Sequence, residues 1–134
     1  MTSLVIYNGN LRTTCIHLAS NREIITDAPV DNNGKGKAFS PTDLVATALG
    51  SCMLTIMGIK AANRGLRIEN TRVEIEKIME SRPRRISEIK AAVKLPAGDF
   101  SEKEKALLER AALSCPVFLS LHADIKKSVH FEYS

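Results

Sequence analysis

Tryptophan is missing from this sequence of 134 residues, and tyrosine and phenylalanine together supply only 4% of it. Aliphatic side chains must therefore build the core, which a chain of this length can form as one domain. Internal repeats, low-complexity tracts and a glycine-rich phosphate loop are also missing. The hydrophobic fraction of 44% and the charged fraction of 25% are ordinary for a globular protein. We expect a single domain over residues 1–134.

The sequence also lacks the charged start and long apolar run of a secretory signal. Its longest run without charge, Leu44–Ile59, is shorter than the roughly 18 to 20 residues that cross a bilayer, so we expect a buried helix and no membrane association. Three cysteines in a chain that is not exported indicate a reducing compartment, which predicts a cytoplasmic protein. The formal net charge of +4 would attract anionic substrates but does not by itself indicate a nucleic-acid partner.

Turn residues divide the first part of the chain into three predicted short strands between Ser3 and Pro29. Asn8–Asn10 and Ser20–Asn21 supply the turns between these strands. The segment Val30–Phe39 is rich in glycine, asparagine and lysine, which predicts a loop.

A long helix is predicted over Pro41–Arg64. Ser40 suits the N-cap, Asp43 lies three residues later as in a capping box, and Gly65 is a natural stop. The helix is apolar on nearly every side apart from a weakly polar face at every fourth residue, so we expect neighbours to cover most of it.

The rest of the sequence predicts two strands, two helices and a last strand. The strands are predicted at residues 66–81 and 85–95 with a turn at Arg82–Arg85, which we interpret as a solvated hairpin turn and not a nucleic-acid contact. A capping box at Ser101 and Glu104 begins an amphipathic helix, a short helix follows from Pro116, and residues 127–134 form the last strand. The order βββ-α-ββ-αα-β indicates an α+β fold.

Two cysteines occupy positions that suggest chemistry. Cys52 lies in the middle of the most apolar segment, where a small buried core residue is the simpler interpretation. Cys115 precedes Pro116 at the start of a predicted helix, where unpaired amides are expected to lower the pKa of its thiol and expose a thiolate. Two such thiols in one pocket would form a redox pair, although their spacing in the sequence does not show that they meet.

The motifs "FSPTDLVATALGSC" and, later, "SCPVFLSL" resemble those of the OsmC/Ohr family of thiol-dependent peroxide reductases. The resemblance covers nearly the whole chain, including the order of elements. It implies a swapped homodimer in which strands of both subunits surround the long helices and the active sites lie at the subunit interface. It also implies that Cys52 attacks an organic hydroperoxide and becomes a sulfenic acid, that Cys115 resolves it as a disulfide, and that a dithiol such as a dihydrolipoyl group reduces the pair.

Peroxide-reducing members of this family also use an arginine beside the thiolate and an acidic residue in the first turn of the long helix to orient that arginine. Here Thr42 stands where active members often carry glutamate. The adjacent Asp43, which has a shorter side chain, is our candidate for the acidic site residue, so we expect a modest peroxidase rate. Arg12 is our first candidate for the cation, because a guanidinium favours an ionised thiol. Other candidates are Arg22, Lys35 and Lys37. Each of these charges has an alternative role as a solvated surface residue.

A non-catalytic protein of the same fold is the alternative function. It would bind a small apolar ligand or sense oxidants through the same cysteines, and Thr42 keeps this alternative open. Cys15 and His17 share one side of a predicted strand and, with His122, are conceivable metal ligands. No recognised ligand spacing supports such a site, so we expect no metal or cofactor, and a structural role for Cys15.

Overall fold

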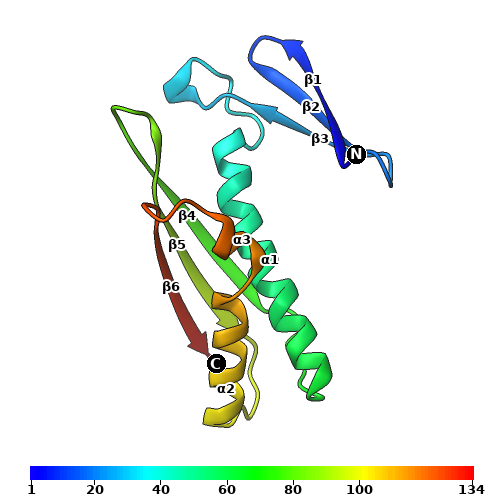
Figure 1. Ribbon diagram of the computed structural model, residues 1–134, viewed down its shortest axis with the longest axis vertical. Coiled ribbons are helices and arrows are strands. Elements are labelled where there is room, and N and C mark those ends of the chain that lie inside the picture. Colours follow the sequence, from blue (N-terminus) through cyan, green and yellow to red (C-terminus); the bar gives the residue numbers. More distant parts are fainter. The chain divides into compact units, whose positions relative to one another are not determined.

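The computed structural model describes residues 1–134, which form two compact units, Met1–Val45 and Ala46–Ser134. The order of its elements is βββ-α-ββ-αα-β once a short 3₁₀ turn, η1 (Val30–Asn32), is set aside, which confirms the predicted α+β class (Figure 1). Each unit is described separately below.

The first unit is built on an antiparallel sheet of β1 (Ser3–Gly9), β2 (Arg12–His17) and β3 (Arg22–Asp27). The predicted turns are confirmed. Between β1 and β2 the chain takes positive φ angles at Gly9, Asn10 and Leu11, and between β2 and β3 it does so at Asn21. Glycine and asparagine adopt this backbone readily, which is why the sequence turns at these points.

Apolar side chains of this first sheet are exposed on both faces. Direct cross-strand partners share a face, so Val5, Cys15 and Ile24 lie on one side and Ile6, Thr14 and Ile25 on the other. The exposed fraction is 59% for Val5 and 43% for Ile6. The buried residues of the unit are polar ones: Thr26, Asp27 and Ser40. The first unit therefore has no apolar core of its own.

Helix α1 (Pro41–Asn63) begins and ends close to the predicted residues. The Ser40 hydroxyl accepts a hydrogen bond from the Asp43 amide at 3.1 Å, and the Asp43 carboxylate accepts one from the Ser40 amide at 3.0 Å. This is a reciprocal capping box, with aspartate in the place that glutamate usually takes. After the helix, Gly65 has a φ of +67°, as expected for a left-handed stop.

Within one chain, neighbours cover only one face of α1, so the expectation that most of the helix is covered stays a prediction that depends on a second copy of the chain. The buried positions follow the helical period and are Ala46, Leu49, Gly50, Met53, Met57 and Ala61. Val45 and Ile59, in contrast, are 40% and 52% exposed. By length and composition α1 could span a membrane, a property that it shares with core helices of soluble proteins.

The second unit contains a mixed sheet with strand order β4-β5-β6. β4 (Arg72–Glu80) pairs antiparallel with β5 (Arg85–Leu95), and β5 pairs parallel with β6 (Lys126–Tyr133). The predicted strand at 66–81 was too long, since β4 begins at Arg72. Leu66 and Ile68 pack against the core from the preceding connection, and their apolar character explains the error.

The helices of the second unit cover one face of this sheet (Figure 1). α2 (Glu102–Leu113) begins with the predicted capping box of Ser101 and Glu104, and α3 (Pro116–Ser120) begins at Pro116. All fully buried hydrophobic residues of the chain lie in this unit. α1 approaches the sheet at Gly50, where an added Cβ would lie 3.2 Å from the Ile75 side chain. This contact is tighter than ordinary packing, so glycine allows the helix and β4 to lie close together.

Candidate functional site: a thiol pair and a buried ion pair

Cys115 is the N-cap residue of α3. Its sulfur accepts a hydrogen bond from the Phe118 amide, with 3.4 Å between Sγ and N, and Pro116 occupies the first turn. The local sequence explains this geometry, because proline needs no amide partner at the start of a helix and a cap needs a short acceptor side chain. The Cys115 side chain is fully buried, with an exposed fraction of 0%.

Burial raises the pKa of the Cys115 thiol, contrary to our expectation of a lowered pKa and an exposed thiolate. The Phe118 and Val117 amides do lower the pKa, as the helix start predicts, but desolvation of the thiolate is the larger effect. The interaction with Cys52 raises the pKa further. Cys115 is therefore a protonated thiol at neutral pH.

Cys52 and Cys115 lie close together within the second unit: both pack in its hydrophobic core, and Cys52 is near enough to help raise the pKa of the Cys115 thiol. Both thiols are free, and no disulfide joins them. Cys52 is partly buried on α1 and packs against the hydrophobic core. Around the pair lie apolar side chains of α1 and α3, among them Met53, Ile56 and Phe118. The structure thus places two thiols that can be oxidised in an apolar environment.

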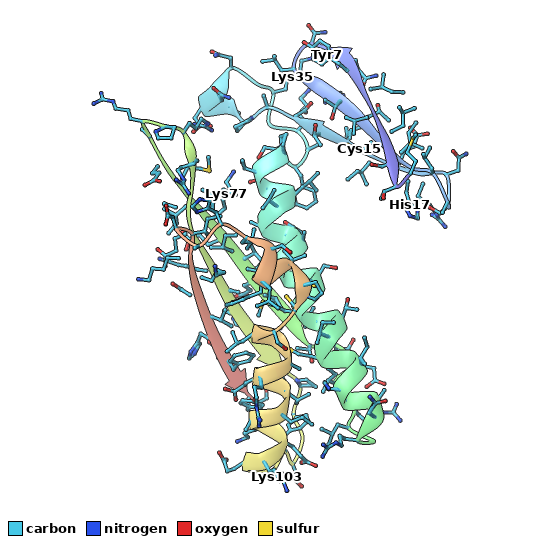
Figure 2. All side chains as sticks on the ribbon, viewed as in Figure 1. Tyr7, Cys15, His17, Lys35, Lys77 and Lys103 are labelled. Carbon is cyan, nitrogen blue, oxygen red and sulfur yellow. The ribbon has the colours of Figure 1, made fainter.

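Two lysines lie at one level of the covered sheet face, and sequence reasoning missed them. Lys77 and Lys127 are the cross-strand partners of Ile89, which is fully buried, so the three residues share a face (Figure 2 labels Lys77). The Lys127 ammonium lies 5.2 Å from the centre of the Phe118 ring, a cation–π contact. The signal was present in the sequence, because Lys77 continues the apolar alternation of Val73 and Ile75.

A buried ion pair is the main polar feature of the first unit. Arg12 donates two hydrogen bonds to Asp27, from Nε to Oδ1 at 2.7 Å and from Nη2 to Oδ2 at 2.8 Å. The side chain of Asp27 is 1% exposed and that of Arg12 is 35% exposed. The hydrogen bonds from Arg12 hold the pKa of Asp27 below its ordinary value, although burial opposes this effect, and Asp27 raises the pKa of Arg12. Sequence reasoning did not identify Asp27.

The remaining candidates for the cation and its acidic partner occupy other places. The Asp43 carboxylate caps the start of α1, and the Thr42 hydroxyl lies 3.3 Å from the Ser40 hydroxyl. The backbone amide of Lys37 donates to Oδ2 of Asp27 at 3.1 Å, and the charge of Lys35 helps to lower the pKa of Asp27. Arg22 is an exposed residue at the start of β3.

The third cysteine, Cys15, belongs to the first unit, on β2, opposite Val5 and Ile24. Cys15 and His17 share one face of β2, as predicted (Figure 2). The His17 ring pairs with the Ser20 hydroxyl, whereas His122 accepts a hydrogen bond from the Asp124 amide. No group of three or more histidine, cysteine or acidic residues is arranged to hold a metal ion.

Comparison with known proteins defines the class of this fold. The OsmC-like protein family matches residues 34–130, which include both cysteines of the pair. The chain belongs to this family. A protein of known structure from Psychrobacter arcticus, named as an osmotic stress induced and detoxification response protein, is 52% identical, with a TM-score of 0.95 over 98% of this chain and 96% of that one.

More distant structures share the fold. An organic hydroperoxide resistance protein OsmC from Legionella pneumophila is 15% identical with a TM-score of 0.77, over 98% of this chain and 97% of that one. An organic hydroperoxide resistance protein from Elizabethkingia anophelis is 16% identical with a TM-score of 0.77, over 100% of this chain and 97% of that one. No curated protein matches the sequence.

Proposed function

We propose that this protein reduces organic hydroperoxides with the Cys52 and Cys115 thiols and so contributes to defence against oxidative stress. The observation that carries the proposal is that both cysteines belong to one apolar core cluster, close enough for Cys52 to influence the pKa of the Cys115 thiol. Membership of a family that includes organic hydroperoxide resistance proteins supports it. The apolar side chains beside Cys52 favour an alkyl substituent on the peroxide, because burying its surface is favourable by about 25 cal/mol per Å².

The reaction proceeds in three balanced steps. The Cys52 thiolate attacks the terminal oxygen of ROOH, the O–O bond breaks, and the alkoxide takes a proton and leaves as ROH. Sulfur is thereby oxidised to the sulfenic acid. The Cys115 sulfur then attacks the Cys52 sulfur, its proton leaves with the hydroxide as water, and a disulfide forms. A dithiol, such as a dihydrolipoyl group, reduces this disulfide and becomes a cyclic disulfide itself.

The protonated state of Cys115 suits formation of the disulfide better than attack on the peroxide. A thiol whose pKa is raised by burial is a poor nucleophile towards peroxide at neutral pH. It is also protected from direct oxidation, because its sulfur is fully buried. We therefore assign the first attack to Cys52 and the resolving role to Cys115.

We also propose that the functional molecule is a homodimer in the reducing cytoplasm. Apolar side chains are exposed on the first sheet and along the uncovered side of α1, including Val5, Ile6, Val45 and Ile59. Exposed apolar surface of this extent is typical of a subunit interface. A second copy of the chain is the partner that covers such a surface in most oligomers.

The proposed activity is tested by measuring the loss of cumene hydroperoxide in the presence of a dithiol. Cys52→Ser should abolish consumption, and Cys115→Ser should allow one turnover before it stalls, because the sulfenic acid then lacks an internal thiol. Cys15→Ser is the matched control and should react like the wild type. Mass mapping after oxidation should find the Cys52–Cys115 disulfide. Equal, slow consumption by the wild type and Cys52→Ser would reject the enzyme and favour ligand binding or sensing.

A further inference from the structure

Phe118 of α3 connects a lysine of the second sheet to the Cys115 thiol. Its backbone amide donates to the Cys115 sulfur, with 3.4 Å between N and Sγ, and the centre of its ring lies 5.2 Å from the Lys127 ammonium. A cation attracts the negative face of an aromatic ring, so the second contact holds the ring against β6. One residue thus binds the thiol through its backbone and is itself held through its side chain.

Lys127 lies on the covered face of the sheet, where a charged side chain is uncommon. It is a cross-strand partner of the fully buried Ile89 and is itself half-buried. No carboxylate of the second unit pairs with Lys127, whereas Lys94, on the opposite face, lies 2.8 Å from Glu74. A half-buried ammonium without a carboxylate depends on other partners, and here that partner is the Phe118 ring.

Helix α3 has few other contacts that hold it in place. It contains five residues, none of them buried, and Leu119 is 69% exposed. A helix this short is not stable by itself and depends on its packing. Val117 and Phe118 are the residues of α3 that pack against the core. The contact with Lys127 is therefore one of the few that fix the start of α3, where Cys115 lies.

The contact acts on Cys115 through position and not through charge. Burial and Cys52 raise the pKa of the Cys115 thiol, and the Phe118 and Val117 amides oppose them; no lysine is among these causes. A change at Lys127 therefore reaches the thiol by way of Phe118.

We propose that Lys127 is the positioning residue for the resolving thiol. By holding the Phe118 ring, it keeps the start of α3 and the Cys115 sulfur in place beside Cys52. The step that it serves is disulfide formation, in which the Cys115 sulfur bonds to the sulfur of the Cys52 sulfenic acid, and the hydroxide takes the thiol proton and leaves as water. The proposal rests on the proposed peroxidase function. Lys127 itself does not touch the reacting atoms, so it acts only through Phe118.

Two opposing effects decide the sign of a substitution at Lys127. Loss of the contact frees α3, which would help a buried sulfur to move towards its partner. It also lets the sulfur leave the geometry from which a disulfide forms, and that geometry is narrow. We expect the loss of position to dominate, because Cys52 and Cys115 already lie close together in the reduced protein and a positioned pair reacts faster than a mobile one.

The test is a single turnover of the reduced protein with stoichiometric cumene hydroperoxide, followed by acid quenching and mass mapping. Lys127→Met should slow formation of the Cys52–Cys115 disulfide by about two- to fivefold, the size expected for one partly exposed cation–π contact. The Cys52 sulfenic acid, trapped with dimedone, should form at the rate of the wild type and accumulate. Lys127→Arg should keep most of the rate of disulfide formation, because a guanidinium also stacks on a ring.

Lys126→Met is the matched control. It removes the same charge from the neighbouring, exposed position of β6, on the opposite face of the sheet, and should form the disulfide like the wild type.

A double-mutant cycle isolates the contribution of the ring. Phe118→Leu keeps the backbone amide that binds the Cys115 sulfur but removes the partner of Lys127, so Lys127→Met should cause no further slowing in that background. Circular dichroism should show that each variant is folded. If Lys127→Met forms the disulfide as fast as the wild type or faster, if Lys127→Arg is as slow as Lys127→Met, or if both backgrounds slow equally, the positioning role is rejected while the peroxidase stands.

A second readout does not depend on peroxide. The Cys115 sulfur is fully buried, so iodoacetamide reaches it only when the structure around it opens. Alkylation of Cys115, located by mass mapping, should be about two- to fivefold faster in Lys127→Met and unchanged in Lys126→Met. Ser101→Ala, which weakens the start of α2, is the control for a general loss of stability and should leave this alkylation unchanged.

The two readouts separate this inference from the proposed function. A wild type that consumes no more peroxide than Cys52→Ser rejects the peroxidase, whereas faster alkylation of Cys115 in Lys127→Met would still support the positioning of that thiol. If alkylation rises equally in Ser101→Ala, Lys127 contributes to stability alone, and its positioning role is rejected.

Discussion

The two units of the chain differ in whether their apolar side chains are buried or exposed. In Ala46–Ser134 the apolar residues of one sheet face and three helices form a buried core. In Met1–Val45 the buried residues are polar, and apolar side chains are exposed on both sheet faces. The second unit can therefore be stabilised by its own packing, whereas the first is ordered by turns, strand pairing and the Arg12–Asp27 pair. The difference indicates that the first unit needs a covering surface from outside itself, which we propose a second copy of the chain supplies.

The largest expected effect is in the core of the second unit. Leu108→Ala removes a fully buried side chain of α2 and should lower the free energy of unfolding by about 2–5 kcal/mol, because a cavity remains. Leu4→Ala, on the exposed first sheet, is the comparison and should have a much smaller effect on the unfolding of a dissociated chain. Urea denaturation at low protein concentration measures both. Equal losses would contradict the contrast between the two units.

A smaller effect should distinguish the two faces of the first sheet. Ile6 lies on the same face as Arg12 and Val5 on the opposite face. If Arg12 serves the reaction, its face is turned towards the dimer interior, so Ile6→Asp should weaken the dimer by about 10- to 100-fold in dissociation constant, or about 1.4–2.7 kcal/mol. Val5→Asp should weaken it less. Sedimentation at several concentrations measures both, and a wild type that stays monomeric at micromolar concentration would exclude the dimer.

The cap of α2 should contribute about 1 kcal/mol. Ser101→Ala removes the acceptor for the Glu104 amide, 3.1 Å away, and leaves that donor to water. The thermal midpoint of unfolding should fall by a few degrees. Activity should be unchanged, because Ser101 takes no part in the proposed reaction. Ser3→Ala, an exposed serine of the first unit, is the control and should leave the midpoint unchanged.

The smallest expected effect is on stability at acid pH, and it arises from Asp27 in the first unit. The folded pKa of Asp27 is lowered, chiefly by the hydrogen bonds from Arg12, from an unfolded value of about 3.9. Its contribution to stability is therefore present above about pH 4 and is lost as the pH falls through the lower folded pKa. Thermal midpoints between pH 6 and pH 2 should fall less steeply for Asp27→Asn than for the wild type. Parallel profiles would show that the pair does not stabilise the fold.

Most of the fold could be predicted because the turn and cap residues that separate its elements are recognisable in the local sequence. Asn10, Asn21 and Gly65 have the positive φ angles that their residue types allow, and the start of α2 follows from its capping box. The start of β4 was missed because Leu66 and Ile68 are apolar for tertiary reasons. Composition predicts that α1 is covered on most sides, but it does not say whether the same chain supplies the cover.

The site was predicted less completely, because its chemistry depends on distance and burial. The pairing of Cys52 with Cys115 came from resemblance alone, and the pKa of Cys115 was misjudged because a sequence shows the helix start but not the desolvation. Asp27 was missed although a signal existed: once the turn pairs His17 with Arg22, antiparallel register brings Arg12 opposite Asp27. The proposed roles of Arg12 and Asp43 remain predictions.

Gly50 has a consequence for the distance between the two sulfurs. The close approach of α1 to β4 at this residue sets the height of the helix above the sheet, and Cys52 lies only two residues further on. A methyl group at position 50 would press against the Ile75 side chain, and wherever the helix gave way by a few tenths of an ångström the Cys52 sulfur would move with it. The distance between the two sulfurs thus depends on a residue that has no side chain.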